Sequence, residues 1–190
     1  MPLTMSELKV VKKRYERLEV LRRELQKLSS DAQRLAKQAI FSLQRDNEKE
    51  GHSRLEEALL ILKKAQKISQ TEQRLAGDGM WRSALEEAAE AVLFFRLITK
   101  HEIASGKLFN DPTILLGGLS DAIGELVRFA VRAATAGDID RVNKIADQAE
   151  ELVEFITSLD MTGSLRAKGD QARSHLRRLE DIRYDISRRV

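Results

Sequence analysis

The chain has 190 residues, a net charge of +3 and no cysteine, and 33% of its residues are charged. This length suits one domain with a substantial core, spanning residues 1–190, and two prolines with ten glycines are typical of an all-helical protein. The lack of cysteine excludes disulfides, thiolate metal ligands and a cysteine nucleophile. No run of eighteen apolar residues and no apolar signal core occurs, so we expect a cytoplasmic location without a membrane partner.

Hydrophobic periodicity, interrupted by turn residues, predicts seven helices and no strands. The first is expected to end near Leu28 and the second near Glu48. Each helix begins at or near a residue that is common at helix N-caps. In chain order, these starting residues are Thr4 or Ser6, Ser29 or Asp31, Ser53, Asp78, Asp111, Asp138 and Ser164.

The first predicted helix has two different faces. Lys9, Lys13 and Arg17 are four residues apart, so they form a basic row that can follow the phosphates of a nucleic acid. The alternative is a solvated face paired with Glu16 and Glu24. On another face, apolar residues recur at steps of three and four, which predicts a buried stripe of Leu8, Val11, Tyr15, Leu18, Leu21, Leu25 and Leu28.

Two pairs of carboxylates lie in unusually apolar helical segments. Glu87 and Glu90 are three residues apart and share a helix face, whereas Glu86 is expected to point elsewhere. Asp121 and Glu125 lie on the following helix, four residues apart, so they share one face of that helix. Like charges at this spacing repel, and a carboxylate in apolar surroundings is costly unless it pairs with a cation or binds a metal.

The turn-rich segment 105–112 separates the two pairs and predicts that their helices are antiparallel neighbours. At about 1.5 Å per residue, Glu87 and Glu90 lie roughly 21–26 Å before this turn. Asp121 and Glu125 lie roughly 14–20 Å after it, by the same helical rise. The depths nearly match, so the four carboxylates are expected to converge.

Four carboxylates without histidine or cysteine make an all-oxygen site, which suits Mg²⁺ or Mn²⁺ rather than zinc. Such an ion can activate a water for hydrolysis of a phosphodiester or pyrophosphate. The alternative is a set of structural ion pairs with nearby arginines, namely Arg82, Arg96, Arg128 and Arg132. The charge distribution favours a cation-binding centre, because residues 78–160 hold fifteen acidic and eight basic side chains while both ends are basic.

Six further residues are candidates for a role in the site or the core. Trp81 and Arg82 can stack on a base and hold its phosphate, or Trp81 can anchor the core or a subunit interface. His101 and His175 are far from the carboxylates in sequence, so we expect them to be structural or exposed. Gly117 and Gly118 weaken a helix, which close approach of another helix or of RNA would explain.

The segments EEAAEAVLFF and GGLSDAIGELVRFAVRAATAGDID resemble the translin superfamily, and its TRAX branch more than translin itself. The family's ExxEA motif matches Glu87 and Glu90, and its GxxDxxGELxR motif matches Asp121, Glu125 and Arg128. The stretch LRRLEDIRYDISR resembles the family's last helix. The similarity covers about 110 residues from Trp81 onward, and without an extended basic N-terminal tail the chain resembles a compact prokaryotic or archaeal member.

The resemblance implies a seven-helix translin-type bundle of long antiparallel helices that assembles into a hollow homo-octamer with nucleic acid inside. It also implies that Glu87, Glu90, Asp121 and Glu125 bind Mg²⁺ or Mn²⁺ and cut single-stranded RNA. Arg128, Arg82 and the Lys9–Lys13–Arg17 row are the expected RNA-binding residues. Two alternatives remain: a non-catalytic nucleic-acid-binding shell similar to translin, and a MazG-like nucleotide pyrophosphohydrolase, whose EExxE motif fits Glu86, Glu87 and Glu90 although the following DxxxE spacing departs from its pattern.

Overall fold

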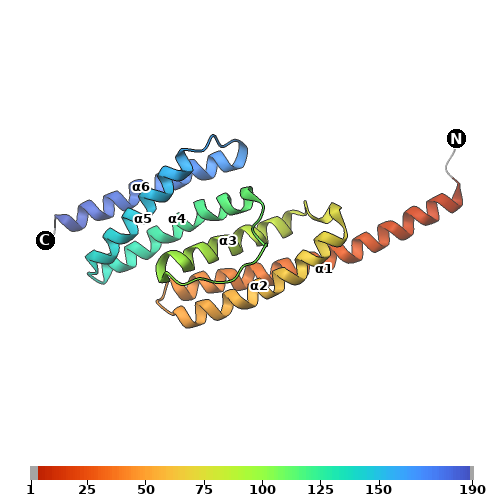
Figure 1. Ribbon diagram of the computed structural model, residues 1–190, viewed down its shortest axis with the longest axis horizontal. Coiled ribbons are helices and arrows are strands. Elements are labelled where there is room, and N and C mark those ends of the chain that lie inside the picture. The colour runs from red at the N-terminus through yellow and green to blue at the C-terminus, as the bar shows by residue number, and fades with distance from the viewer. Residues whose placement is uncertain (1–3, 189–190) are drawn as a thin grey trace.

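The computed structural model describes residues 4–188, which fold into six α-helices and one short 3-10 helix (Figure 1). No strand occurs between residues 4 and 188, so the all-α prediction is confirmed, with six α-helices instead of seven. In chain order the elements are α1 (Met5–Leu43), α2 (Glu48–Thr71), η1 (Gln73–Leu75), α3 (Gly79–Thr99), α4 (Pro112–Thr135), α5 (Ile139–Thr157) and α6 (Gly163–Ser187).

The helix count differs because α1 joins the first two predicted helices. Ser29 and Asp31 do not cap a new helix, and Ser29 is fully buried inside α1. No glycine or proline interrupts residues 5–43, and the buried face continues through Leu25, Ala32 and Leu35. A continuous buried face outweighs the weak preference of serine and aspartate for helix ends.

Most helix starts agree with the capping residues seen in the sequence. Thr4 forms a capping box with Glu7, and the side chains of Asp78, Asp111 and Asp138 accept hydrogen bonds from backbone N–H groups of the first turns. Two starts differ. Asn47 caps α2 before the predicted Ser53, and α6 begins at Gly163 after Thr162, which makes no side-chain cap hydrogen bond.

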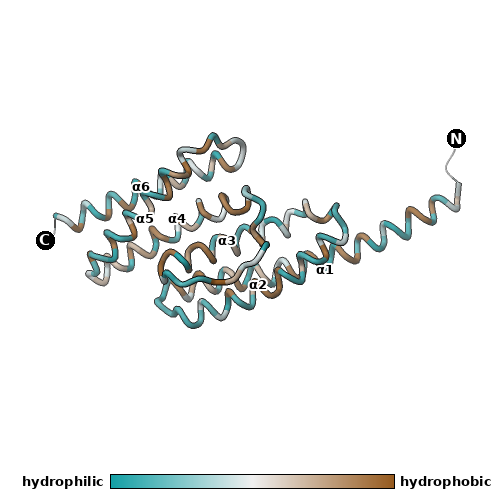
Figure 2. Tube along the Cα trace, viewed as in Figure 1, coloured by the Kyte–Doolittle hydropathy of each residue, from teal (hydrophilic) through white to brown (hydrophobic). Residues whose placement is uncertain are grey.

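The helices form two groups of three that share one hydrophobic core. Helices α1, α3, α4 and α6 lie side by side and run in the same direction, while α2 packs against α1 and α3, and α5 packs against α4 and α6, in the opposite direction (Figure 1). The most hydrophobic segments lie along α3 and α4 at the centre, whereas α6 is largely hydrophilic (Figure 2). The centre of the molecule is therefore the α3–α4 pair.

Helices α3 and α4 are parallel, so the predicted antiparallel arrangement is wrong. Near their starts, Arg82 donates to Thr113 with an Nη2–Oγ1 distance of 2.9 Å. Nearer their ends, the rings of Phe94 and Phe129 meet edge to face with centroids 5.7 Å apart. From the first pair to the second, the residue number rises on both helices, so the two helices run in the same direction.

The connection between them makes this direction possible. Residues 100–111 run back along the bundle from the end of α3 to the start of α4 (Figure 1). Extended chain covers about 3.3–3.6 Å per residue, so this segment can span roughly 40 Å, more than the length of α3. Ile103 and Leu108 are buried, and Arg96 donates to the carbonyl of Ile103 at 3.2 Å. These contacts hold the connection against the core.

The first part of α1 extends beyond the other helices (Figure 1). Residues 5–17, which we call the arm, are all exposed, including Leu8, Val11 and Tyr15. In the rest of the predicted apolar stripe Leu25 is buried, and Leu18, Leu21 and Leu28 are partly buried against the core. None of the helices in residues 4–188 combines the length and the apolar character that a bilayer-crossing segment needs.

Candidate carboxylate site

Two glycines bring the backbones of α3 and α4 together at the carboxylates. A Cβ atom on Gly118 would lie 2.7 Å from the backbone nitrogen of Glu90 and 2.8 Å from the Cβ of Ala89. A Cβ on Gly117 would collide with the carboxylate of Glu86. At Gly118 only glycine fits, because the neighbouring atoms are α3 backbone atoms and the Cβ of Ala89, and this confirms the expectation that another helix lies against the pair.

The parallel arrangement explains why the two carboxylate pairs meet. Glu87 lies about 12 Å from the start of α3 and Asp121 about 14 Å from the start of α4, at about 1.5 Å per residue. Because the starts of the two helices are neighbours, equal depths place these side chains side by side. The predicted convergence is therefore correct, although the antiparallel geometry used to predict it is wrong.

Two of the carboxylates are held by α1 and by their own helix. Lys37 places its ammonium 3.4 Å from an oxygen of Glu87. Glu125 accepts from Arg128 at 3.0 Å and from the side-chain amide of Gln44 at 2.9 Å. The pairing of Glu125 with Arg128 agrees with the ion-pair interpretation of the sequence.

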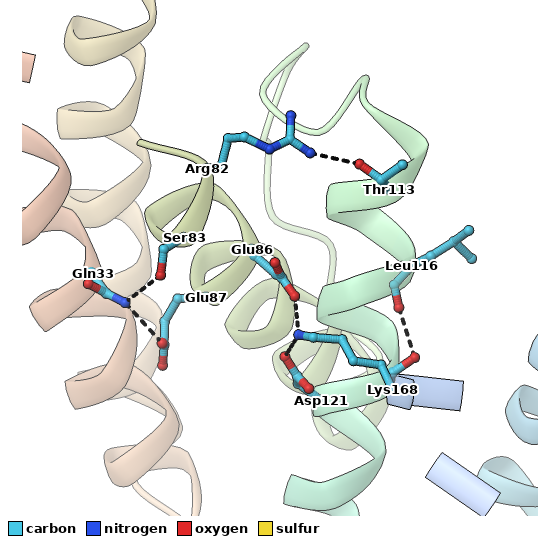
Figure 3. A network of polar contacts seen from close by, with 10 residues as sticks. Gln33, Arg82, Ser83, Glu86, Glu87, Thr113, Leu116, Asp121 and Lys168 are labelled. Atoms are coloured by element: carbon cyan, nitrogen blue, oxygen red, sulfur yellow. Dashed lines mark hydrogen bonds and ion pairs between the residues drawn. The ribbon is translucent and has the colours of Figure 1, made fainter. Parts of the chain in front are cut away.

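Lys168 of α6 reaches between the other carboxylates. Its ammonium donates to both Glu86 and Asp121, and all three side chains are half-buried (Figure 3). Glu86 therefore belongs to the site, although we expected it to point elsewhere. Desolvation lowers the pKa of Lys168, but its hydrogen bonds with Asp121 and Glu86 outweigh that effect and raise the pKa overall.

Glu90 is the member of the site that lacks a cation of its own. No basic side chain in residues 4–188 forms an ion pair with it. Burial and, to a smaller extent, the negative charges of Glu87, Asp121 and Glu125 raise its pKa to about 8, while Lys168 opposes this shift. Five carboxyl groups face three paired cations, and the negative charge around Glu90 together with its burial keeps this carboxyl group protonated at neutral pH.

Glu90 also lies where three hollows meet. The largest, of about 700 Å³, lies between α1 and α4 and includes Arg128. The second, of about 350 Å³, contains Arg82 and Lys168, and the third, of about 360 Å³, contains His175. Arg82 and Arg128 thus share hollows with the carboxylates, and their role in RNA binding stays a prediction.

His175 is nearer to the site than the sequence indicated. It lines a hollow together with Glu90, Asp121 and Glu125. A Cβ atom on Gly124 would lie 3.0 Å from the Nε2 of His175, so the glycine leaves room for the imidazole. Its position fifty residues away in sequence gave no signal of this contact.

The site has the donor chemistry for a hard divalent ion, since carboxylate oxygens are the ligands that Mg²⁺ and Mn²⁺ prefer. Glu90 has no cation of its own and, with its raised pKa, keeps a proton at neutral pH that a bound divalent ion would displace. In the described part of the chain, however, no three acidic or histidine side chains are gathered closely enough to enclose an ion. The reason is that Glu87, Asp121 and Glu125 are turned toward Lys37, Lys168 and Arg128. An arriving ion would have to compete with these cations.

A sequence model of the Translin family matches residues 20–190. The chain belongs to the Translin family. Comparison with curated proteins found no match.

Three solved structures share the fold of this Translin-family chain. Apo-NeC3PO has a TM-score of 0.86 and 21% identity, covering 97% of this chain and all of its own. A complex of AfC3PO with duplex RNA has a TM-score of 0.83 and 23% identity, covering 95% and 96%. The crystal structure of AfC3PO has a TM-score of 0.83 and 24% identity, with the same coverage. At these identities the likeness shows the fold.

Other predicted nucleic-acid contacts of this Translin-family member lie elsewhere. Lys9, Lys13 and Arg17 are exposed on the arm and are not brought to the carboxylates. Trp81 is buried in the core, so it does not offer a stacking surface. Arg82, in contrast, lines a hollow beside the carboxylates, and its guanidinium donates to Asp111 and Thr113 at the start of α4. The role of the arm's basic row in RNA binding stays a prediction.

Proposed function

We propose that this protein is a metal-dependent endoribonuclease of the TRAX type. The observation that carries the proposal is the group of five carboxylates around Glu90, which has more negative charge than its cations balance. This group opens into a hollow that also contains basic side chains. A divalent cation and a polyanion are complementary to these two surfaces.

Glu87, Glu90, Asp121 and Glu125 would hold Mg²⁺ or Mn²⁺. When bound, the ion supplies a more acidic water as nucleophile and stabilises negative charge on the phosphate. Arg128 lies in two of the hollows beside these carboxylates, where it can contact a phosphate of the RNA backbone.

We also propose that the protein works as a hollow homo-oligomer, with eight subunits as the family resemblance implies. The exposed apolar residues Leu8, Val11 and Tyr15 lie at helical spacing on the arm and are not covered within one chain. A second copy of the chain is the simplest cover for such a stripe. The AfC3PO complex with duplex RNA supports RNA as the ligand.

The test is cleavage of labelled single-stranded and duplex RNA with Mn²⁺, with Mg²⁺ and with EDTA. We expect metal-dependent endonucleolytic cuts that Asp121→Asn reduces at least a hundredfold, because the variant loses one anionic ligand. Glu154→Gln is the matched control, since Glu154 is exposed on α5 away from the site. Equal cleavage by Asp121→Asn and Glu154→Gln would refute the site assignment.

A second candidate is a non-catalytic RNA- or DNA-binding shell. It is favoured by the ion pairs that already engage Glu87, Asp121 and Glu125 with basic side chains. This function predicts RNA binding without metal-dependent cleavage in the same assay.

A further inference from the structure

The largest of the three hollows at Glu90 is a groove between α1 and α4, the two helices that flank α3. Lys37, Phe41 and Arg45 lie four residues apart along its α1 wall. The α4 wall contributes Arg128 and Arg132. The remaining lining residues are apolar or belong to the carboxylate site: Ile40, Gln44, Glu87, Glu90, Glu125, Val127 and Val131. The groove therefore joins basic walls, apolar surface and the carboxylates of the site in one space of about 700 Å³.

Phe41 is the unusual residue of this groove. It is 54% exposed, whereas Phe94 and Phe95 of α3 are buried in the core. The guanidinium of Arg45 lies over its ring, 3.8 Å from the centroid. An aromatic ring beside a stacked arginine presents flat surfaces of the kind on which a nucleobase stacks.

The charges of the groove indicate which partner covers Phe41. Centres of protein–protein interfaces are depleted in charged residues. Here four cations line the groove together with Phe41, namely Lys37, Arg45, Arg128 and Arg132. This composition suits a ligand that is both aromatic and anionic, and a nucleotide has both properties.

We infer that the groove is a subsite for one unpaired nucleotide, whose base stacks on Phe41 and whose phosphates contact Arg128 and Arg132. The inference rests on the proposed function for the choice of RNA. It adds a physical cause for strand selection: in a duplex each base is covered by its stacked neighbours and paired at its edge, so it cannot reach Phe41. The subsite binds single strands beside the carboxylates and excludes intact duplex from them.

The experiment measures binding of a short fluorescent RNA by the full-length protein in EDTA, as a single strand and as a duplex of the same sequence. We expect Phe41→Ala to weaken single-strand binding about 5- to 150-fold, the range for loss of one base–aromatic stack. Phe41→Trp should retain it, because the larger ring still stacks. Duplex binding should change less than twofold in both variants.

Phe155→Ala is the matched control, because Phe155 is 51% exposed on α5 and does not line the groove. Unchanged single-strand binding by Phe41→Ala would overturn the inference. Equal losses for single strand and duplex, or a smaller oligomer of Phe41→Ala in light scattering, would also overturn it, because Phe41 would then support the assembly. Metal-dependent cleavage is measured separately, so a protein that binds through Phe41 without cutting RNA refutes the nuclease alone.

Discussion

Replacing Glu90 by glutamine should make the metal-free protein more stable at alkaline pH. The carboxylate of Glu90 is partly buried and faces three others, and its pKa is raised to about 8 from a usual 4.5. Glutamine has nearly the same shape and no charge at any pH. The variant therefore removes the electrostatic conflict and leaves the packing in place.

The sign and size of the effect follow from proton linkage. Between pH 4.5 and 8 the folded protein keeps a proton on Glu90 that the unfolded chain has released. Its contribution to stability is complete below pH 4.5 and is lost as the pH rises through 8. At about 1.4 kcal/mol per pH unit, the loss is at most about 5 kcal/mol. Because the side chain keeps some contact with water, we expect roughly 2 kcal/mol, or about 4–8 °C in melting temperature.

The assay is thermal unfolding in EDTA at pH 5, 6.5 and 8, with both proteins at one concentration. The two melting temperatures should be close at pH 5 and diverge toward pH 8, where Glu90→Gln is the more stable. With Mn²⁺ at pH 8 the wild type should gain more stability than the variant, since the ion replaces the proton. Parallel curves from pH 5 to 8 would refute the reasoning.

Two other variants test the frame of the site. Lys168→Gln should lower the metal-free melting temperature and tighten Mn²⁺ binding measured by calorimetry, because Glu86 and Asp121 lose their shared cation. Arg173→Gln on the same helix is the control and should change neither quantity. Unchanged Mn²⁺ binding by Lys168→Gln would contradict this role for Lys168. Gly118→Ala should destabilise the fold by about 1–3 kcal/mol in urea unfolding, because the added Cβ meets the α3 backbone. Gly77→Ala is the control, since the space around Gly77 is open. Equal stabilities of the two variants would show that α3 and α4 can separate without cost.

Local signals in the sequence predicted a large part of the site. Glu87 and Glu90, like Asp121 and Glu125, could be found because a shared helix face and apolar neighbours are properties of adjacent residues. The caps at Asp78 and Asp111 are equally local, since the side chain bonds to N–H groups two or three residues away. These features need no knowledge of the tertiary structure.

The rest depends on contacts between distant segments. Lys168 is one of several basic residues in α6, and only packing against α4 brings it to Asp121. The direction of α4 depends on the connection 100–111, which is longer than the predicted turn. Ile103 and Leu108 were the available signal, because two apolar residues in a connection indicate that it lies on the core. The helix start predicted at Ser29 was wrong because a residue that often caps helices can also be buried in the middle of one.

The continuity of α1 links two surfaces that otherwise have nothing in common. One uninterrupted helix holds the apolar arm around Val11 and the groove wall at Phe41, roughly 45 Å apart at 1.5 Å per residue. It contains no glycine or proline at which a bend could form. The part of this helix that carries Phe41 is packed in the core through Ala36, Ile40 and Leu43. The core that orients the wall of the groove therefore also sets the direction in which the arm leaves the bundle.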